Sequence, residues 1–145
     1  SKDNPIHPIY LGDAMARNLA DNTILVSENF RAADHLMPFG YGDDEWDLVR
    51  TSGGSLGYGL GGAIGTQLAA PDRPVVLSIG DGGVMYSSSG FWTMARYSLP
   101  ILTVVWNNMN YQTVRTNFAA WGGNATPVSP RALRTMSCGM LGKMV

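Results

Sequence analysis

The sequence predicts a three-layer α/β domain, in which helices cover both faces of a parallel β-sheet. Short apolar runs rich in β-branched residues alternate along the 145-residue chain with stretches of helical spacing. This alternation is typical of parallel strands joined by crossover helices. Two of the runs are long and apolar, as expected of strands in a sheet that is covered on both faces.

The predicted strands share apolar side chains and are bounded by Pro, Gly, Asn or Asp. They lie at residues 23–27, 48–51, 74–79 and 100–106. The predicted helices carry apolar or small side chains at helical spacing. They lie at residues 9–20, 58–70, 87–97 and from about 111 onward, with a last turn or two at 131–136. Residues 31–41 have an ambiguous pattern, and 40–47 form a polar, acidic loop.

Two polar motifs follow the last two strands. Gly80-Asp81-Gly82-Gly83 comes directly after the strand at 74–79, and Asn107-Asn108 comes directly after the strand at 100–106. If these strands are parallel neighbours, Asp81 and Asn108 emerge at the same sheet edge, where open α/β folds bind ligands. A carboxylate and an amide oxygen suit a hard cation such as Mg²⁺, which commonly clamps a phosphate. Either motif alone would be an ordinary turn.

The two motifs together resemble the diphosphate-binding (C-terminal) domain of thiamine diphosphate (ThDP) enzymes. The signature of that superfamily is a Gly-Asp-Gly followed further along the chain by Asn-Asn, and here 27 positions separate Asp81 from Asn108. The resemblance extends over residues 9–145. It is strongest to the benzoylformate decarboxylase and acetolactate synthase branch, where stretches like 80–87 and 107–111 recur.

The resemblance implies a Mg²⁺ site and a diphosphate site. Asp81 would bind the metal directly, Asn108 would supply its side-chain oxygen, and Asn110 its backbone carbonyl. Gly83 and Tyr111 would contact the diphosphate. The other two glycines of the first motif leave room for a tight turn and close approach to a phosphate; they are Gly80 and Gly82.

A second group of residues, Gly54, Ser55 and Leu56, matches the segment that holds the cofactor's aminopyrimidine in this superfamily. The resemblance implies that the Gly54 carbonyl accepts a hydrogen bond from the amine. It also implies that the Leu56 side chain lies beneath the cofactor and bends it, which brings the amine near the thiazolium C2 carbon. The alternative for Leu56 is a place in the hydrophobic core.

Related enzymes line their substrate pocket just after the Asn-Asn motif, at positions that match Thr113, Val114 and Asn117. Phe118 and Trp121 are further candidates for the pocket, although such aromatic residues more often serve in cores or interfaces.

Residues 28–31 depart from the superfamily pattern, which often places hydroxyl side chains against the diphosphate after the first strand. Here Asn29 and Arg31 stand in that region, and Arg31 either makes a charge-assisted contact or faces solvent. His7 and His35 are unlinked to the metal motifs, so we expect neither to act as a catalytic acid or base.

The segment 57–62 also satisfies the dinucleotide-binding pattern G-x-G-x-x-G. That interpretation needs a clear strand before the loop and an acidic residue about 20 positions later. Asp81 falls near that offset, but it already belongs to the better-matched metal motif, and the upstream strand is weak. An NAD-binding oxidoreductase domain therefore stays as an alternative.

The chemistry implied by the resemblance is attack of the ThDP C2 carbanion on a 2-oxo acid or related carbonyl compound, with carbon–carbon bond cleavage or formation. In the superfamily, a glutamate on a separate pyrimidine-binding domain, usually from another subunit, promotes ylid formation. No segment here resembles that domain, and Glu28 and Glu45 lie in the wrong context. We therefore expect no catalytic residue on this chain, an inactive isolated chain, and a homo- or hetero-oligomer. The alternative is a non-catalytic ThDP/Mg²⁺-binding module.

Composition limits the remaining classes. Charged residues are only 14% of the chain, well under the usual quarter, which favours coverage by partner subunits. A net charge of −1 without a basic block argues against nucleic acid. No apolar run reaches membrane-spanning length, and the single cysteine, Cys138, fits a reducing cytoplasm. Residues 1–8 suggest a linker remnant, and we expect the domain at 9–145 to be truncated at its C-terminal end.

Overall fold

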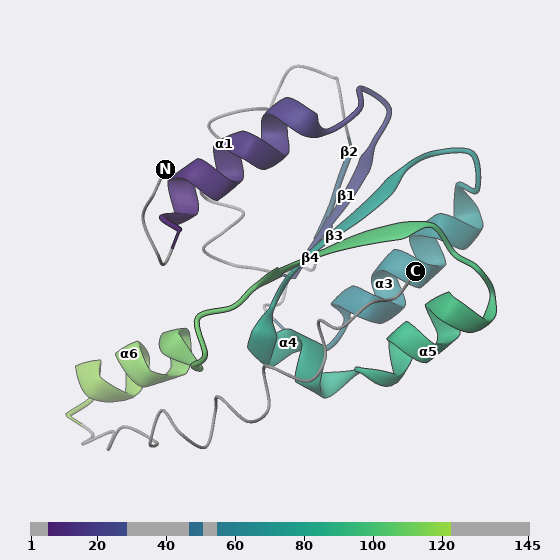
Figure 1. The fold of residues 1–145 in the computed structure, drawn as a ribbon. Coiled ribbons are helices and arrows are strands. Elements are labelled where there is room, and N and C mark those ends of the chain that lie inside the picture. Colours follow the sequence, from purple (N-terminus) through teal and green to yellow (C-terminus); the bar gives the residue numbers. More distant parts are fainter. Residues whose placement is uncertain (1–5, 29–46, 51–54, 123–145) are drawn as a thin grey trace. The chain divides into compact units, whose positions relative to one another are not determined.

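The computed structural model describes residues 6–28, 47–50 and 55–122. The chain divides into two units, Ser1–Trp106 and Asn107–Val145, and each is described by itself. The first unit contains a four-stranded parallel sheet of order β2-β1-β3-β4 (Figure 1). Its strands are β1 (Ile24–Ser27), β2 (Asp47–Arg50), β3 (Val75–Gly80) and β4 (Ile101–Trp106).

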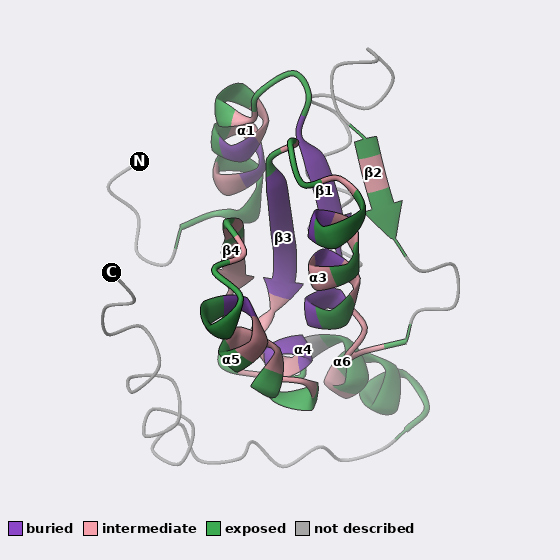
Figure 2. Ribbon diagram, turned by 90° about the vertical axis from the view of Figure 1, so that its right-hand side faces the viewer, coloured by how far each residue is buried: buried purple, intermediate pink, exposed green. Residues whose placement is uncertain are grey.

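Helices cover both faces of this sheet. They are α1 (Pro8–Asn18), α3 (Gly59–Ala69), α4 (Asp81–Tyr86) and α5 (Ser89–Arg96). Helix α1 packs on one face, and the other three helices lie on the opposite face, as Figures 1 and 2 show. The second unit contains α6 (Gln112–Ala120). The predicted three-layer α/β architecture is therefore confirmed.

Two hydrophobic clusters hold the first unit together, one on each side of the sheet. Because successive strand side chains point to opposite faces, Leu25 and Val76 pack with Met15 of α1, while Val26 and Leu77 pack against α3 and its neighbours. The two central strands are almost wholly buried, and the edge strands β2 and β4 are partly exposed (Figure 2). This burial explains the continuous apolar runs in the sequence.

Helix α3 approaches the sheet and α5 closely because its sequence is rich in small residues. A Cβ atom added to Gly90 of α5 would lie 2.9 Å from the Leu60 Cβ of α3, so the glycine permits the contact. Glycine in a helix interior costs about 1 kcal/mol relative to alanine. Burial of Leu60 and Ala63, both 0% exposed, offsets part of that cost.

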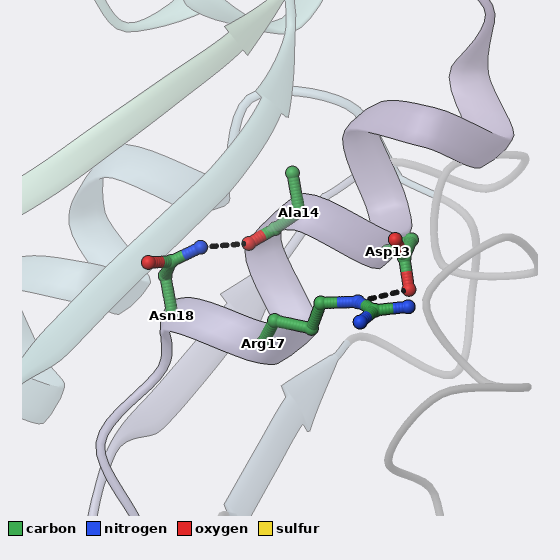
Figure 3. Close-up of polar contacts among 4 residues, drawn as sticks. All are labelled: Asp13, Ala14, Arg17 and Asn18. Atoms are coloured by element: carbon green, nitrogen blue, oxygen red, sulfur yellow. Dashed lines mark hydrogen bonds and ion pairs between the residues drawn. The ribbon is translucent and has the colours of Figure 1, made fainter.

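The exposed face of α1 carries local polar contacts. The Arg17 Nε donates to Asp13 Oδ1 at 2.8 Å, and the Asn18 side chain donates to the Ala14 carbonyl at 2.7 Å (Figure 3). The hydrogen bond to Asp13 raises the pKa of Arg17 above its ordinary value. His7 precedes the helix and its Nδ1 accepts from the Ile9 N–H at 3.3 Å. His7 thus has a helix-capping role of the kind that stabilises N-terminal N–H groups.

The predicted helices and strands within the described residues are found with small shifts of their ends. One further helix, α4, was not predicted. The segment expected to be a tight turn at 80–83 begins α4 at Asp81, and the helix expected at 87–97 is α5. The Asp-Gly-Gly sequence has low helix propensity, so local pattern gave no sign of α4. The ambiguous segment 31–41, the expected loop up to residue 46 and the expected helical turn at 131–136 lie outside the described residues. Asp47, expected to end that loop, instead begins β2. In the part of the chain that the structure describes, no helix is long and apolar enough to cross a membrane.

Candidate cofactor site

The carboxyl ends of β3 and β4 are paired in register. Gly80 lies opposite Trp106 in the parallel ladder, and the Trp106 Nε1 donates to the Ser78 Oγ at 2.8 Å. Asp81 follows β3 directly and opens α4. Asn107 is the next residue after Trp106 along the chain.

Asp81 is partly buried, and its Oδ1 accepts the Gly82 N–H at 3.0 Å. Among the described residues, nothing donates a hydrogen bond to the other carboxylate oxygen. A half-buried carboxylate with one oxygen unused is chemically suited to a hard cation. On this observation, Asp81 fits the metal that the sequence motif implies.

The Asn107–Tyr111 segment, in the second unit, forms a tight loop before α6. The Asn107 Oδ1 accepts the Met109 N–H, and the Asn108 Oδ1 accepts the Asn110 N–H, each at 2.9 Å. Met109 has a φ of 53°, in the left-handed region that non-glycine residues seldom adopt. The Asn108 oxygen keeps a second lone pair, so its orientation is fixed without exhausting its capacity to bind a cation.

The turn before α3 contains Ser55, which is exposed, and Leu56, which is half-buried. Leu56 belongs to neither hydrophobic cluster of the described residues. Gly57 has a φ of +98°, and a Cβ added there would lie 2.8 Å from the Tyr86 Cβ of α4. Glycine is therefore required at position 57, both for the backbone conformation and for contact between this turn and α4.

Glu28 is a feature that the sequence interpretation missed. It follows β1, is only 4% exposed, and donates its backbone N–H to the Ser78 carbonyl at 2.9 Å. Its Oε1 accepts the Gly57 N–H at 2.7 Å, and its Oε2 accepts the Gly59 N–H. An acidic residue directly after a short and mostly apolar strand, in a chain with a Gly-x-Gly at a helix start, was the available signal.

These hydrogen bonds also account for the G-x-G-x-x-G pattern. In a dinucleotide-binding loop, backbone N–H groups of the glycine-rich turn face the pyrophosphate. Here the N–H groups of Gly57 and Gly59 donate to the protein's own Glu28 carboxylate. The motif thus has a structural explanation that needs no dinucleotide.

Gly83 is buried in α4 and faces Glu28. A Cβ added there would lie 2.3 Å from Glu28 Oε1 and 3.0 Å from Ile79 Cγ1. The glycine is therefore needed for packing against the carboxylate, whatever contact its backbone makes with a ligand. Gly80 and Gly82 are partly exposed at the same edge.

Helix α6 carries the residues expected to line a substrate pocket. Thr113 and Asn117, four positions apart, share one helix face, and both are exposed. Val114 is 59%, Phe118 51% and Trp121 88% exposed, so none of the three is a core residue within its unit. Tyr111 immediately precedes α6 and is also exposed.

The remaining candidates lie outside the described residues: Gly54, Asn29, Arg31, His35 and Glu45. Among the residues that are described, no group of three or more His, Cys, Asp or Glu side chains could hold a metal. The expected metal site has one carboxylate, one amide oxygen and one backbone carbonyl, so Asp81 is its only His, Cys, Asp or Glu residue. The absence of a three-residue group among the described residues does not test a site of this composition.

The fold is that of an open parallel α/β sheet, the class of domain that binds ligands beyond the carboxyl ends of its strands. Residues 32–138 match the family model of the thiamine pyrophosphate enzyme, C-terminal TPP binding domain. The chain belongs to this family. The resemblance noted from the sequence is thereby confirmed.

Relatives of this chain include decarboxylases and an acetolactate synthase-like protein. IlvX of Mycobacterium tuberculosis, an acetolactate synthase-like large subunit, is 36% identical over 121 residues, which cover 83% of this chain and 23% of IlvX. A benzoylformate decarboxylase of Pseudomonas aeruginosa is 40% identical over 62 residues, covering 43% of this chain and 12% of that enzyme.

A solved structure gives the same result. The thiamine diphosphate-dependent 4-hydroxybenzoylformate decarboxylase of Rhodococcus jostii RHA1 superposes with a TM-score of 0.74 and 28% identity. The match covers 88% of this chain and 24% of the decarboxylase. The matched region thus spans about a quarter of the length of IlvX and of the Rhodococcus decarboxylase.

Proposed function

We propose that this chain supplies the Mg²⁺- and diphosphate-binding half of a ThDP-dependent active site. The complete enzyme would cleave or form a carbon–carbon bond of a 2-oxo acid, as a decarboxylase, lyase or acetolactate-type synthase. The single observation that carries the proposal is the paired ends of β3 and β4 in a member of the TPP-binding family. Asp81 follows β3 directly in the sequence, and the Asn-Asn motif follows β4.

In this proposal the metal is held by oxygen atoms. Asp81 offers the carboxylate oxygen that no described residue engages, Asn108 offers its oriented side-chain oxygen, and Asn110 offers its backbone carbonyl. This donor set matches the preference of Mg²⁺ for oxygen ligands.

The cofactor-binding residues we propose lie before α3, at the end of β3 and the start of α4, and directly before α6. They are Gly54, Ser55, Leu56, Gly80, Gly82, Gly83 and Tyr111. When bound, ThDP supplies a nucleophilic carbon and an electron sink. The chain's own residues bind the diphosphate, orient the cofactor and exclude water from it. Thr113, Val114 and Asn117 of α6 would contact the substrate.

The rest of the active site would come from a pyrimidine-binding domain of the same or another subunit, including the catalytic glutamate. Support comes from the relatives, of which this chain covers only 23% and 24%. An oligomeric, cytoplasmic enzyme and an inactive isolated chain are parts of the same proposal. A non-catalytic ThDP/Mg²⁺-binding module is the second candidate, and the absence of turnover in the complete protein would favour it.

The test is calorimetric titration of the complete protein with ThDP, in the presence of Mg²⁺ and after its removal with EDTA. We expect saturable binding that needs the metal, and no binding of NAD under the same conditions. ThDP binding that is unchanged by EDTA would contradict the metal site. Binding of NAD without ThDP binding would replace the proposal with an oxidoreductase.

A further inference from the structure

We propose that Glu28 is a positioning residue for the cofactor site, an inference that rests on the function proposed above. Its buried carboxylate fixes the turn at 55–58 against the start of α4. These two segments hold Ser55, Leu56, Gly82 and Gly83, which are among the residues proposed to bind the cofactor. Glu28 would therefore determine how tightly ThDP binds without touching ThDP.

Both carboxylate oxygens of Glu28 are directed at the turn. Oε1 accepts the Gly57 N–H at 2.7 Å, and Oε2 accepts the Gly59 N–H. Backbone hydrogen bonds to a charged acceptor are stronger than bonds between neutral groups. The position of Glu28 itself is fixed by the backbone bond to Ser78 in the central strand β3. The turn is thereby tied to the most buried part of the sheet.

Helix α4 packs closely against the same carboxylate. A Cβ at Gly83 would lie 2.3 Å from Oε1, and a Cβ at Gly59 would lie 2.6 Å from Oε2. Tyr86 of α4 packs against Gly57 on the same turn. The end of β1, the turn and α4 thus surround one carboxylate, and glycine is the residue that permits each close approach.

Burial of the Glu28 carboxylate has a free-energy cost. Glu28 is 4% exposed, and no ion pair involves it among the described residues. A buried carboxylate without a cation is costly unless hydrogen bonds compensate. Costly buried groups of this kind are found more often where they position a functional segment than where they serve packing alone.

The decisive variant is Glu28→Gln, which keeps the shape of the side chain. The amide has only one oxygen acceptor, so its NH₂ group must face the N–H of Gly57 or Gly59. One of the two hydrogen bonds to the turn is then lost, and the amide NH₂ group faces a backbone N–H, so that two donors oppose each other. The turn at 55–58 is therefore held less firmly. In the complete protein with saturating Mg²⁺, we expect the Kd for ThDP to rise at least about tenfold, measured by calorimetry. Glu28→Asp, one methylene shorter, restores part of the affinity because one oxygen still reaches the turn.

The matched control is Asp13→Asn, the same carboxylate-to-amide change on the exposed surface of α1. It should leave the Kd within about twofold, the scale of an exposed ion pair. A second readout is the energetic coupling between Gly83 and Glu28, measured with a double-mutant cycle on ThDP binding. Gly83→Ala should weaken ThDP binding in the wild-type background and less in the Glu28→Ala background, because the severe clash with Oε1 is then gone and only the 3.0 Å contact with Ile79 Cγ1 remains.

The outcomes separate this inference from the proposed function. If the wild-type protein does not bind ThDP with Mg²⁺, the proposed function fails and this inference fails with it. If the wild type binds and folded Glu28→Gln binds equally well, only the inference about Glu28 is overturned. If Glu28→Gln does not fold, hydrogen exchange of the wild type decides. Gly57 and Gly59 amides that are protected before ThDP is added support the inference, and amides that exchange freely until ThDP is added overturn it.

Discussion

Gly80 of β3 and Trp106 of β4 are register partners at the last pair of the parallel ladder. The residue after Gly80 is Asp81, and the residues after Trp106 are Asn107 and Asn108. Asp81 and the Asn-Asn motif thus each follow directly, along the chain, the end of one of two paired strands. This pairing is the basis for the metal-related predictions below.

Removal of the Asp81 carboxylate should abolish metal-dependent cofactor binding. Asp81 provides the only carboxylate in the proposed metal set, so we expect Asp81→Ala to weaken ThDP binding at least about 100-fold at fixed Mg²⁺. Calorimetry on the complete protein measures the effect. Asp72→Ala, the same change at an exposed position before the opposite end of β3, is the control and should bind normally. Retained affinity in Asp81→Ala would place the metal elsewhere.

The Asn-Asn motif offers a matched pair of substitutions. Asn107 and Asn108 each accept one backbone N–H at 2.9 Å, so alanine removes an equivalent local hydrogen bond at either position. Only Asn108 is proposed to bind the metal. We expect Asn108→Ala to raise the Mg²⁺ concentration needed for half-maximal ThDP binding about tenfold or more, and Asn107→Ala to raise it much less. Equal effects of the two substitutions would reduce the role of Asn108 to that of a turn residue.

The sheet and most helices could be predicted from the sequence because the signals are local. Apolar strand runs at 74–79 and 100–106 and the small-residue helix at 58–70 correspond to β3, β4 and α3. The family could also be predicted, because the spacing between Asp81 and Asn108 is distinctive when each motif directly follows a strand.

Helix α4 and the role of Glu28 could not be predicted from local pattern. Helix α4 begins with Asp-Gly-Gly, a sequence of low helix propensity, and it is held by contacts with residues far along the chain. Glu28 contacts Gly57 and Gly59 across 29 and 31 positions. Such a contact depends on the order of strands in the sheet, which hydrophobic periodicity does not encode.

Two glycines should respond to alanine in opposite ways. Gly57 has a positive φ, and a Cβ there would lie 2.8 Å from Tyr86, so Gly57→Ala should destabilise the fold by about 2 kcal/mol or more. Gly65 lies on the exposed side of α3 with nothing within 4 Å of an added Cβ. Gly65→Ala should therefore stabilise the fold by about 0.5–1 kcal/mol. Urea unfolding measures both. Similar effects at the two positions would show that the turn at Gly57 is not constrained.

Helix α6 should influence substrate choice without affecting the cofactor. Val114 is 59% exposed, so position 114 can accommodate a larger side chain. We expect Val114→Phe to change kcat/KM for aromatic relative to short aliphatic 2-oxo acids by about tenfold, with the Kd for ThDP unchanged. Steady-state assays on the complete enzyme with both substrate types measure this ratio. An unchanged ratio would remove Val114 from the proposed pocket.

The isolated 145-residue chain should show no turnover, although it carries the proposed metal and diphosphate ligands. General acid–base help at the cofactor requires a group within hydrogen-bond reach of the ring. Glu28, the buried glutamate of the described residues, has both oxygens engaged by Gly57 and Gly59, so it is not available for that role. Measurement of CO₂ release from 2-oxo acids by the purified chain with ThDP and Mg²⁺ tests this, with the complete protein as the positive control. Turnover by the chain alone would mean that it contains its own acid–base group, and Glu45 would then be the first residue to substitute.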